Sequence, residues 1–321
     1  MKKPAFLITI DTEGDNLWQN HHIITTKNTA YLPRFQLLCE KYGFKPTWLT
    51  NYEMAKDSAY VEFASDVITR HQGEVGMHLH AWNSPPEYQL TDNDGKWQPY
   101  LIEYPDNILK DKIRFMTHLL EDTFQTSIRS HRAGRWAFDE RYANSLIELG
   151  YYVDCSVTPR VNWQFNSGSP DGNGGTNYTH FPSKAYFIDP DNIARSGTGA
   201  LLEVPMSTSY KHSKLITSIK QTIDNLRGKK RSPSVNWLRP SRNNLPEMIR
   251  VIEDNLSTGH DYVEFMLHSS EFMPGGSPTF STEQHIEQLF DNLEALFDGL
   301  KDRVEGKTMT DYYYDFKNSY V

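Results

Sequence analysis

Cysteine is scarce in this chain, which has two cysteines in 321 residues. Neither Cys39 nor Cys155 belongs to a Cys-x-x-Cys pair or to a cluster with histidines. Two isolated thiols exclude a disulfide framework. We therefore expect both cysteines to be free and buried.

Long apolar runs are also absent. No stretch approaches the roughly 20 apolar residues that a membrane-spanning helix needs. The first ten residues include a short apolar run, but it is too short for the core of a signal peptide and meets Asp11 without a cleavage site. The sequence predicts no membrane span and, by default, a cytoplasmic location.

An excess of positive charge is lacking too. The chain has 33 Lys and Arg against 41 Asp and Glu, a net charge of −8, and no domain-sized block is basic. Proteins that bind nucleic acid gain most of their affinity from cationic contacts to phosphates. We therefore expect no nucleic-acid partner, whereas the sequence leaves the oligomeric state open.

What the chain does contain is an alternation of strands and helices. Short apolar runs rich in β-branched residues are followed by segments with helical spacing of apolar positions. The expected strands are 5–10, 46–49, 74–78, 127–132, 151–156, 201–205 and 262–267, and the expected helices are 32–42, 58–70, 107–124, 139–149, 213–226, 245–256 and 282–300.

About seven such units without a separating linker predict a single α/β domain over residues 1–321. We expect a distorted or incomplete (β/α)7 barrel and not an open doubly wound sheet, because no Gly-x-Gly-x-x-Gly follows the first strand. The irregular segment 162–199 is long enough to be a functional or mobile loop. The basic run 228–231 is expected to be a solvated loop.

The reactive groups of a parallel barrel gather where its strands end. The first strand ends at Asp11 and Glu13, and the third ends at His78 and His80. Each pair is two residues apart, so both members point to the same side of an extended backbone. A carboxylate with two histidines suits a hydrolytic divalent metal, zinc above all. An aspartate after a strand is often only a helix cap, but capping does not require two histidines on another strand.

Three further ionisable residues lie in or directly after other expected strands. Arg132 could hold a carboxylate by bidentate hydrogen bonds and lower its pKa, or form a weak surface ion pair. Asp154 lies in the fifth expected strand and is a candidate site residue or, alternatively, part of a helix cap or a turn. His268 follows the last strand, where a histidine can donate a proton to a leaving group near neutral pH or serve as a structural residue.

The order of these strand-end motifs along the chain resembles that of the NodB-like polysaccharide deacetylases, which are carbohydrate esterase family 4 and its relatives. The resemblance spans residues 6–278 and is closest to the branch found with surface-polysaccharide genes, where His-x-His and a late His-Ser-Ser precede a Pro-Gly-Gly turn. The matching segments are Asp11-Thr12-Glu13, Glu74-Val75-Gly76-Met77-His78-Leu79-His80, Arg132-Ala133-Gly134-Arg135-Trp136, Asp154, Leu202-Glu203-Val204-Pro205, Leu267-His268-Ser269-Ser270 and Pro274-Gly275-Gly276.

The resemblance implies a distorted seven-stranded (β/α) barrel that removes an N- or O-linked acetyl group from a sugar with a bound metal. The family's first motif has adjacent aspartates, a base and a ligand, whereas Thr12 here separates Asp11 from Glu13. The family's histidines lie four residues apart, whereas Trp82 stands four residues after His78.

The resemblance also implies a role for each candidate. We expect a divalent metal, best zinc, bound by Glu13, His78 and His80, although Asp11 could be the ligand and Glu13 the base. In the first reading Asp11 is the base, oriented by Arg132. His268 is then the general acid, oriented by Asp154.

Two other functions fit the same residues. One is a hydrolase of related fold that acts on a non-sugar amide, and the other is a carbohydrate-binding protein with an inactive site. Tryptophans near the expected strand ends could stack on sugar rings or simply pack the loops. These are Trp18, Trp82, Trp97, Trp136 and Trp163.

Overall fold

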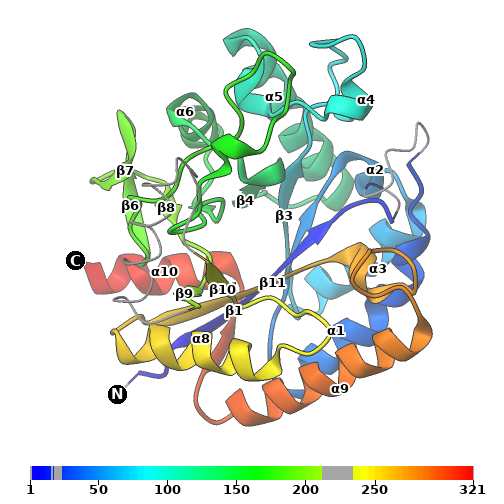
Figure 1. Cartoon of the computed structure of the whole chain (residues 1–321), viewed down its shortest axis with the longest axis vertical. Helices are drawn as coiled ribbons and strands as arrows, with labels where there is room; N and C mark the ends of the chain where they lie inside the picture. The colour runs from blue at the N-terminus through cyan, green and yellow to red at the C-terminus, as the bar shows by residue number, and fades with distance from the viewer. Residues whose placement is uncertain (1, 16, 18–23, 212–233, 321) are drawn as a thin grey trace, which may run out of the picture.

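The computed structural model describes residues 2–15, 17, 24–211 and 234–320 (Figure 1). The strands are β1 (Ala5–Thr12), β2 (Thr47–Thr50), β3 (Glu74–Leu79), β4 (Ser130–Ala133), β5 (Val153–Asp154), β6 (Tyr186–Asp189), β7 (Asn192–Ser196), β8 (Leu202–Glu203), β9 (Thr208–Tyr210), β10 (Val235–Trp237), β11 (Tyr262–His268) and β12 (Glu305–Lys307). The helices are α1 (Leu32–Lys41), α2 (Tyr52–Ala55), α3 (Ser58–Thr69), α4 (Asp94–Trp97), α5 (Asp106–Phe124), α6 (Glu140–Glu148), α8 (Leu245–Ser257), α9 (Glu283–Leu300) and α10 (Met309–Tyr320).

One curled sheet organises the described residues. Its strand order is β11-β1-β2-β3-β4-β5-β8-β6-β7, and β12 also pairs with β1. The run from β11 to β8 is parallel, whereas β6 and β7 are antiparallel additions. This arrangement confirms the predicted distorted barrel.

The barrel is bridged at the place where β8 and β11 face each other. There the Glu264 amide donates to Ser207 Oγ at 2.9 Å, and the Met266 amide donates to the Leu238 carbonyl at 3.2 Å. Ser207 follows β8, and Leu238 follows β10 of the small β9–β10 hairpin. Isolated hydrogen bonds to these flanking segments take the place of a continuous ladder between β8 and β11. The barrel is distorted for this reason.

Strand β1 lies in the interior of the protein. All eight of its residues are buried, as expected for a strand covered on both faces. The helices lie around the outside of the sheet, with α8 and α9 next to each other (Figure 1). Phe297 of α9 is fully buried and meets the rings of Phe6, Phe44 and Phe265 at centroid distances of 5.8, 5.1 and 6.2 Å.

Most predicted elements have a counterpart within a few residues, and both cysteines are buried and free as expected. The segment 162–199 differs, because it contains the antiparallel pair β6 and β7 and is not wholly irregular. The C-terminal helix α10 is also additional; its Tyr312 and Tyr313 pack on the far side of the sheet from α9. The predicted helix 213–226 and loop 228–231 lie outside the described residues.

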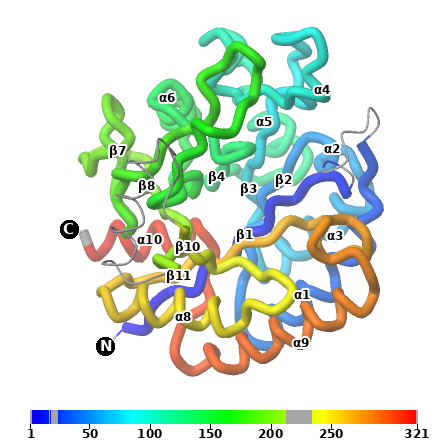
Figure 2. The backbone as a smooth tube through the Cα atoms, viewed as in Figure 1, coloured from blue at the N-terminus to red at the C-terminus, as the bar shows by residue number. Residues whose placement is uncertain are grey.

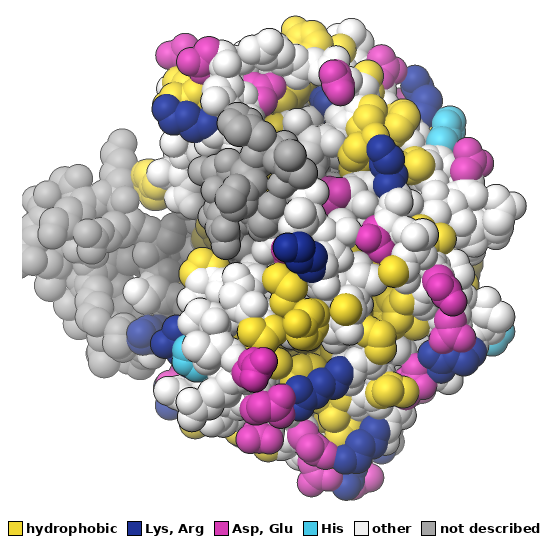
Figure 3. Space-filling model, turned by 90° about the vertical axis from the view of Figure 1, so that its right-hand side faces the viewer, with side chains coloured by type: hydrophobic (Ala, Val, Ile, Leu, Met, Phe, Trp, Pro, Cys, Tyr) yellow, Lys and Arg dark blue, Asp and Glu magenta, His cyan; other side chains and the backbone are white. Residues whose placement is uncertain are grey.

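The N-terminal segment of the described chain lies close to helix α10 (Figure 2), where Lys2 Nζ is 3.0 Å from a carboxylate oxygen of Asp315. Basic and acidic side chains are interspersed on the face shown in Figure 3. In the part of the chain that is described, no helix is both long and apolar enough to cross a bilayer.

The aromatic packing beneath α9 predicts a large effect of one truncation. Phe297→Ala should lower the free energy of unfolding by about 3–5 kcal/mol, because it leaves a cavity among rings that cannot close around it. Urea denaturation followed by circular dichroism measures this. Leu37→Ala on α1, where the side chain is 64% exposed, is the control and should change little; similar losses in both variants would contradict the packing.

Candidate metal centre and active site

The register of the parallel strands brings the predicted residues together at one end of the barrel. Asp11 on β1 is paired with His268 on β11, and His78 on β3 is paired with Arg132 on β4. Glu13 follows β1 directly. Strand ends that are far apart in sequence therefore supply neighbouring side chains.

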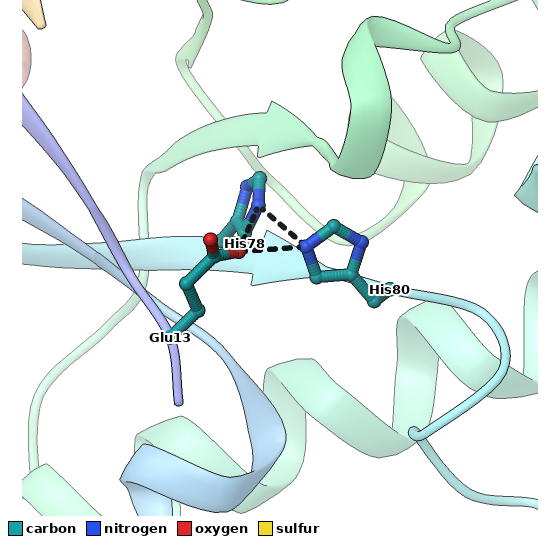
Figure 4. Close-up of side chains that lie close together, drawn as sticks. All are labelled: Glu13, His78 and His80. Atoms are coloured by element: carbon teal, nitrogen blue, oxygen red, sulfur yellow. Dashed lines mark hydrogen bonds and ion pairs between the residues drawn. The ribbon is translucent and has the colours of Figure 1, made fainter. Parts of the chain in front are cut away.

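Three ligand atoms converge between β1 and β3, as Figure 4 shows. His80 Nε2 lies 2.8 Å from Glu13 Oε2 and 3.2 Å from His78 Nε2, and His78 Nε2 lies 3.6 Å from Glu13 Oε2. Ligands about 2.0–2.1 Å from a tetrahedral zinc are roughly 3.3 Å from one another. The three separations bracket that value, so the residues fit a divalent metal with an open position.

Hydrogen bonding at the other ring nitrogen prepares His78 for this role. Its Nδ1 lies 3.0 Å from the Arg132 carbonyl oxygen, which can only accept, so Nδ1 carries a proton and the neutral ring presents the lone pair of Nε2 to the centre. His80 Nδ1 is buried without a hydrogen-bond partner among the described residues. Gly134 makes room for that ring, because a Cβ there would lie 2.6 Å from His80 Nδ1.

The charges at the centre suit a cation. Burial opposes ionisation of Glu13, but His268, His78 and His80 outweigh it and hold the Glu13 pKa well below its usual range. Burial lowers the pKa of His80 to about 4, so that ring is neutral at pH 7. Burial acts in the same direction on His78, but Asp11 and Glu13 raise its pKa overall. The ionised Glu13 and the neutral His80 are in the protonation state that metal binding requires, and His78 must also be neutral when it binds a metal.

Arg132 lies under this centre and is fully buried. Its Nη1 donates to Asp11 Oδ1 at 2.6 Å, and its Nη2 donates to Thr9 Oγ1 at 2.7 Å and to Glu264. The guanidinium thus bridges two carboxylates and does not bind one in bidentate fashion. Burial opposes ionisation of Asp11, but Arg132, His78 and His268 together lower its pKa.

His268 faces the two first-strand carboxylates. Its Nε2 is 3.8 Å from Asp11 Oδ2 and 3.9 Å from Glu13 Oε1. Its Nδ1 is 3.2 Å from Glu271 Oε2 and 3.0 Å from Arg239 Nη2. Glu271 also accepts the His268 amide at 2.9 Å, so one buried carboxylate fixes both the backbone and the ring.

The predicted contact between Asp154 and His268 is wrong. Asp154 is fully buried inside the barrel, where its Oδ1 is 2.5 Å from His131 Nδ1 and its Oδ2 accepts the Ser156 amide at 3.0 Å. Glu271 instead stands beside His268, because a short turn after β11 brings it back to the ring. The three-residue spacing of His268 and Glu271 could have indicated this, whereas no local signal pointed to Arg239.

A cavity of about 340 Å³ opens above the centre. Its walls include Asp11, Glu13, His78, His80 and His268, the aromatic residues Trp82, Tyr100, Trp136 and Trp163, and the cationic residues Arg135 and Arg239. Of the other candidate tryptophans, Trp97 donates to Asp92 and is not in the lining, and Trp18 lies outside the described residues. The cavity therefore combines a candidate metal centre with aromatic walls.

The surroundings of Glu271 predict a pH-dependent loss of stability. Burial opposes its ionisation, but Arg239 and His268 lower the Glu271 pKa to about 2 from 4.5. A lowered carboxyl pKa stabilises the fold above about pH 4.5, and the stabilisation is lost as the pH falls toward 2. Glu271→Gln should cost about 3 kcal/mol near pH 7 and clearly less near pH 3.5.

Urea denaturation at both pH values measures this difference. Glu287→Gln is the control, because the Glu287 carboxylate pairs with Arg34 on the exposed surface and is expected to matter little. A cost for Glu271→Gln that is the same at both pH values would contradict the assignment.

Comparisons with known proteins bear on the fold. No protein-family model and no curated protein matches the chain. A solved structure described as a putative glycoside hydrolase/deacetylase from Parabacteroides distasonis has a TM-score of 0.66 at 9% identity, over 99% of this chain and 72% of that one. A putative polysaccharide deacetylase from Mycobacterium smegmatis has a TM-score of 0.57 at 13% identity, over 100% of this chain and 92% of that one.

A 4-alpha-glucanotransferase from Thermococcus litoralis also shares the fold, with a TM-score of 0.50 at 13% identity over 97% of this chain and 40% of that one. Because one fold can carry different reactions, these likenesses establish architecture and not activity. They confirm that this chain has the NodB-like barrel that its motifs predict.

Proposed function

We propose that this protein is a metal-dependent hydrolase that removes an acetyl group, N- or O-linked, from a sugar of a surface polysaccharide or its precursor. The observation that carries the proposal is the triangle of Glu13, His78 and His80, which shares one cavity with Asp11 and His268. The fold shared with polysaccharide deacetylases supports this class of reaction.

Glu13, His78 and His80 would hold the metal, and zinc suits this set because two imidazoles and a carboxylate form a common catalytic zinc site. A divalent ion bound there supplies Lewis acidity, which polarises a carbonyl and makes water more acidic. The rest of the chemistry falls to the side chains around the ligands.

Asp11 acts as the base. Its Oδ1 is held by Arg132, which keeps the carboxylate ionised and fixes its orientation. The other oxygen, Oδ2, faces His268 across the cavity and is available to accept a proton from the attacking water. A base within the reaction cavity and ionised near neutral pH meets both requirements of general-base catalysis.

His268 acts as the general acid. Its Nε2 points toward Asp11 and Glu13, and its Nδ1 is held by the Glu271 carboxylate. The Glu271 carboxylate orients the ring so that Nε2 faces the cavity, from where it can give a proton to the departing amine or hydroxyl. Trp82, Trp136 and Trp163 supply apolar faces on which a sugar ring can stack.

The proposed metal site predicts how many metal ions each chain contains. Protein purified without added metal should contain about one divalent ion per chain, and a His78→Ala, His80→Ala double variant should contain almost none. Elemental analysis by mass spectrometry measures both. Asp11→Asn is the matched control, because a base that does not bind the metal can lose activity while the ion is retained.

The possible outcomes separate the roles. Full occupancy in the double variant would refute the ligand set. Loss of metal in Asp11→Asn would make Asp11 a ligand and Glu13 the base.

The acid role predicts that substrates respond differently to the loss of His268. His268→Ala should slow removal of an N-acetyl group by about 10² to 10⁴, because an amine needs a proton to leave. Hydrolysis of an aryl acetate should suffer much less, since a phenolate leaves without one. Steady-state rates on an N-acetylated oligosaccharide and on an aryl acetate test this, with metal content measured in parallel; equal losses on both substrates would refute the role.

A further inference from the structure

A second cavity of about 510 Å³ lies apart from the candidate metal centre. It is enclosed by β9, by the C-terminal half of α8, and by the segments around Arg160 and Lys184. Of the described residues that line it, none also lines the cavity above the metal centre. Its chemistry can therefore be considered independently of the proposed reaction.

The lining is strongly cationic. Among the described residues that line it, four are cationic, Arg160, Lys184, Lys211 and Arg250, and one is a carboxylate, Asp254. This is an excess of three positive charges in a chain whose net charge is −8. None of the four cations forms an ion pair with a carboxylate in the part of the chain that is described.

Elsewhere on the surface the pattern is different. Cations there commonly lie against acidic partners, as Lys301 does with Asp298 and Arg303 with Glu253, both at 2.7 Å. Like charges that gather without partners repel one another, and an anion in the cavity relieves this repulsion.

Arg160 is held in place before any ligand arrives. Its Nη1 donates to the Thr208 carbonyl at 3.2 Å and to Thr208 Oγ1 at 2.7 Å, and its guanidinium lies 5.0 Å from the centre of the Tyr210 ring. The backbone of Arg160 adopts φ of 74°, a left-handed conformation that is uncommon for a residue with a side chain. Its Nε and Nη2 donate to no group in the described structure, so a side chain that is already fixed keeps N–H donors available for a ligand.

We propose that this cavity binds a small ligand that carries a phosphate group. A phosphate ester brings about −1.5 to −2 charges and three acceptor oxygens, which match several cations better than a single carboxylate does. The cavity is of the size that holds drug-sized ligands, so there is room for a sugar or nucleoside beside the phosphate.

The test is calorimetric titration of the full chain with glucose 1-phosphate, and with glucose and glucuronate as neutral and carboxylate comparisons. Glucose 1-phosphate should bind, and a Lys184→Gln, Arg250→Gln double variant should weaken it about tenfold or more, because two charged donors are lost. A Lys301→Gln, Arg303→Gln double variant removes the same charges from side chains that are ion-paired and do not line the cavity, and it should bind as the wild type does.

Four results would overturn the proposal. They are an absence of glucose 1-phosphate binding at about 10 mM, equal weakening in the two double variants, glucuronate binding as tight as that of glucose 1-phosphate, and loss of binding in the His78→Ala, His80→Ala variant. The last result would place the phosphate at the metal centre. Retained binding in that variant separates this cavity from the fate of the proposed deacetylase.

Discussion

One buried guanidinium connects the strands on which the candidate active site depends. Arg132 on β4 bonds to Asp11 and Thr9 on β1, to Glu264 on β11, and to the Cys155 carbonyl just after β5. A buried arginine is costly unless charged partners and hydrogen bonds compensate for lost water. Because those partners lie on separate strands, the barrel must bring these strands together for the charge to be tolerated.

The barrel interior contains more carboxyl groups than Arg132 alone can neutralise. Glu203 is paired in register with Asp154, and burial together with the Asp154 charge raises the Glu203 pKa well above its usual range. A carboxyl kept protonated in this way limits the negative charge inside the barrel. Asp154, with His131 on its other side, thus belongs to the support of the barrel, whereas Asp11 and Glu13 reach the cavity.

Two pairs of a carboxylate and a histidine lie at the rim of the barrel, and we propose a different role for each. Glu13 with His80 is buried and suits a cation between them, whereas Glu271 with His268 leaves the outer nitrogen of the ring facing the cavity. The difference lies in geometry: Glu13 approaches Nε2, and Glu271 approaches Nδ1. In our proposal, side chains of the same types therefore serve metal binding in one case and proton transfer in the other.

The sequence by itself determined the repeating strand and helix order, and with it the side on which Asp11, Glu13, His78, His80 and His268 gather, because parallel strands end at one rim. It did not reveal the β6–β7 hairpin, whose strands are short. Only the tertiary structure decided that Glu271 and not Asp154 meets His268, and that Arg132 bridges two carboxylates. Such partners come from segments that packing brings together. The spacing of residues along the sequence therefore does not predict which of their side chains meet.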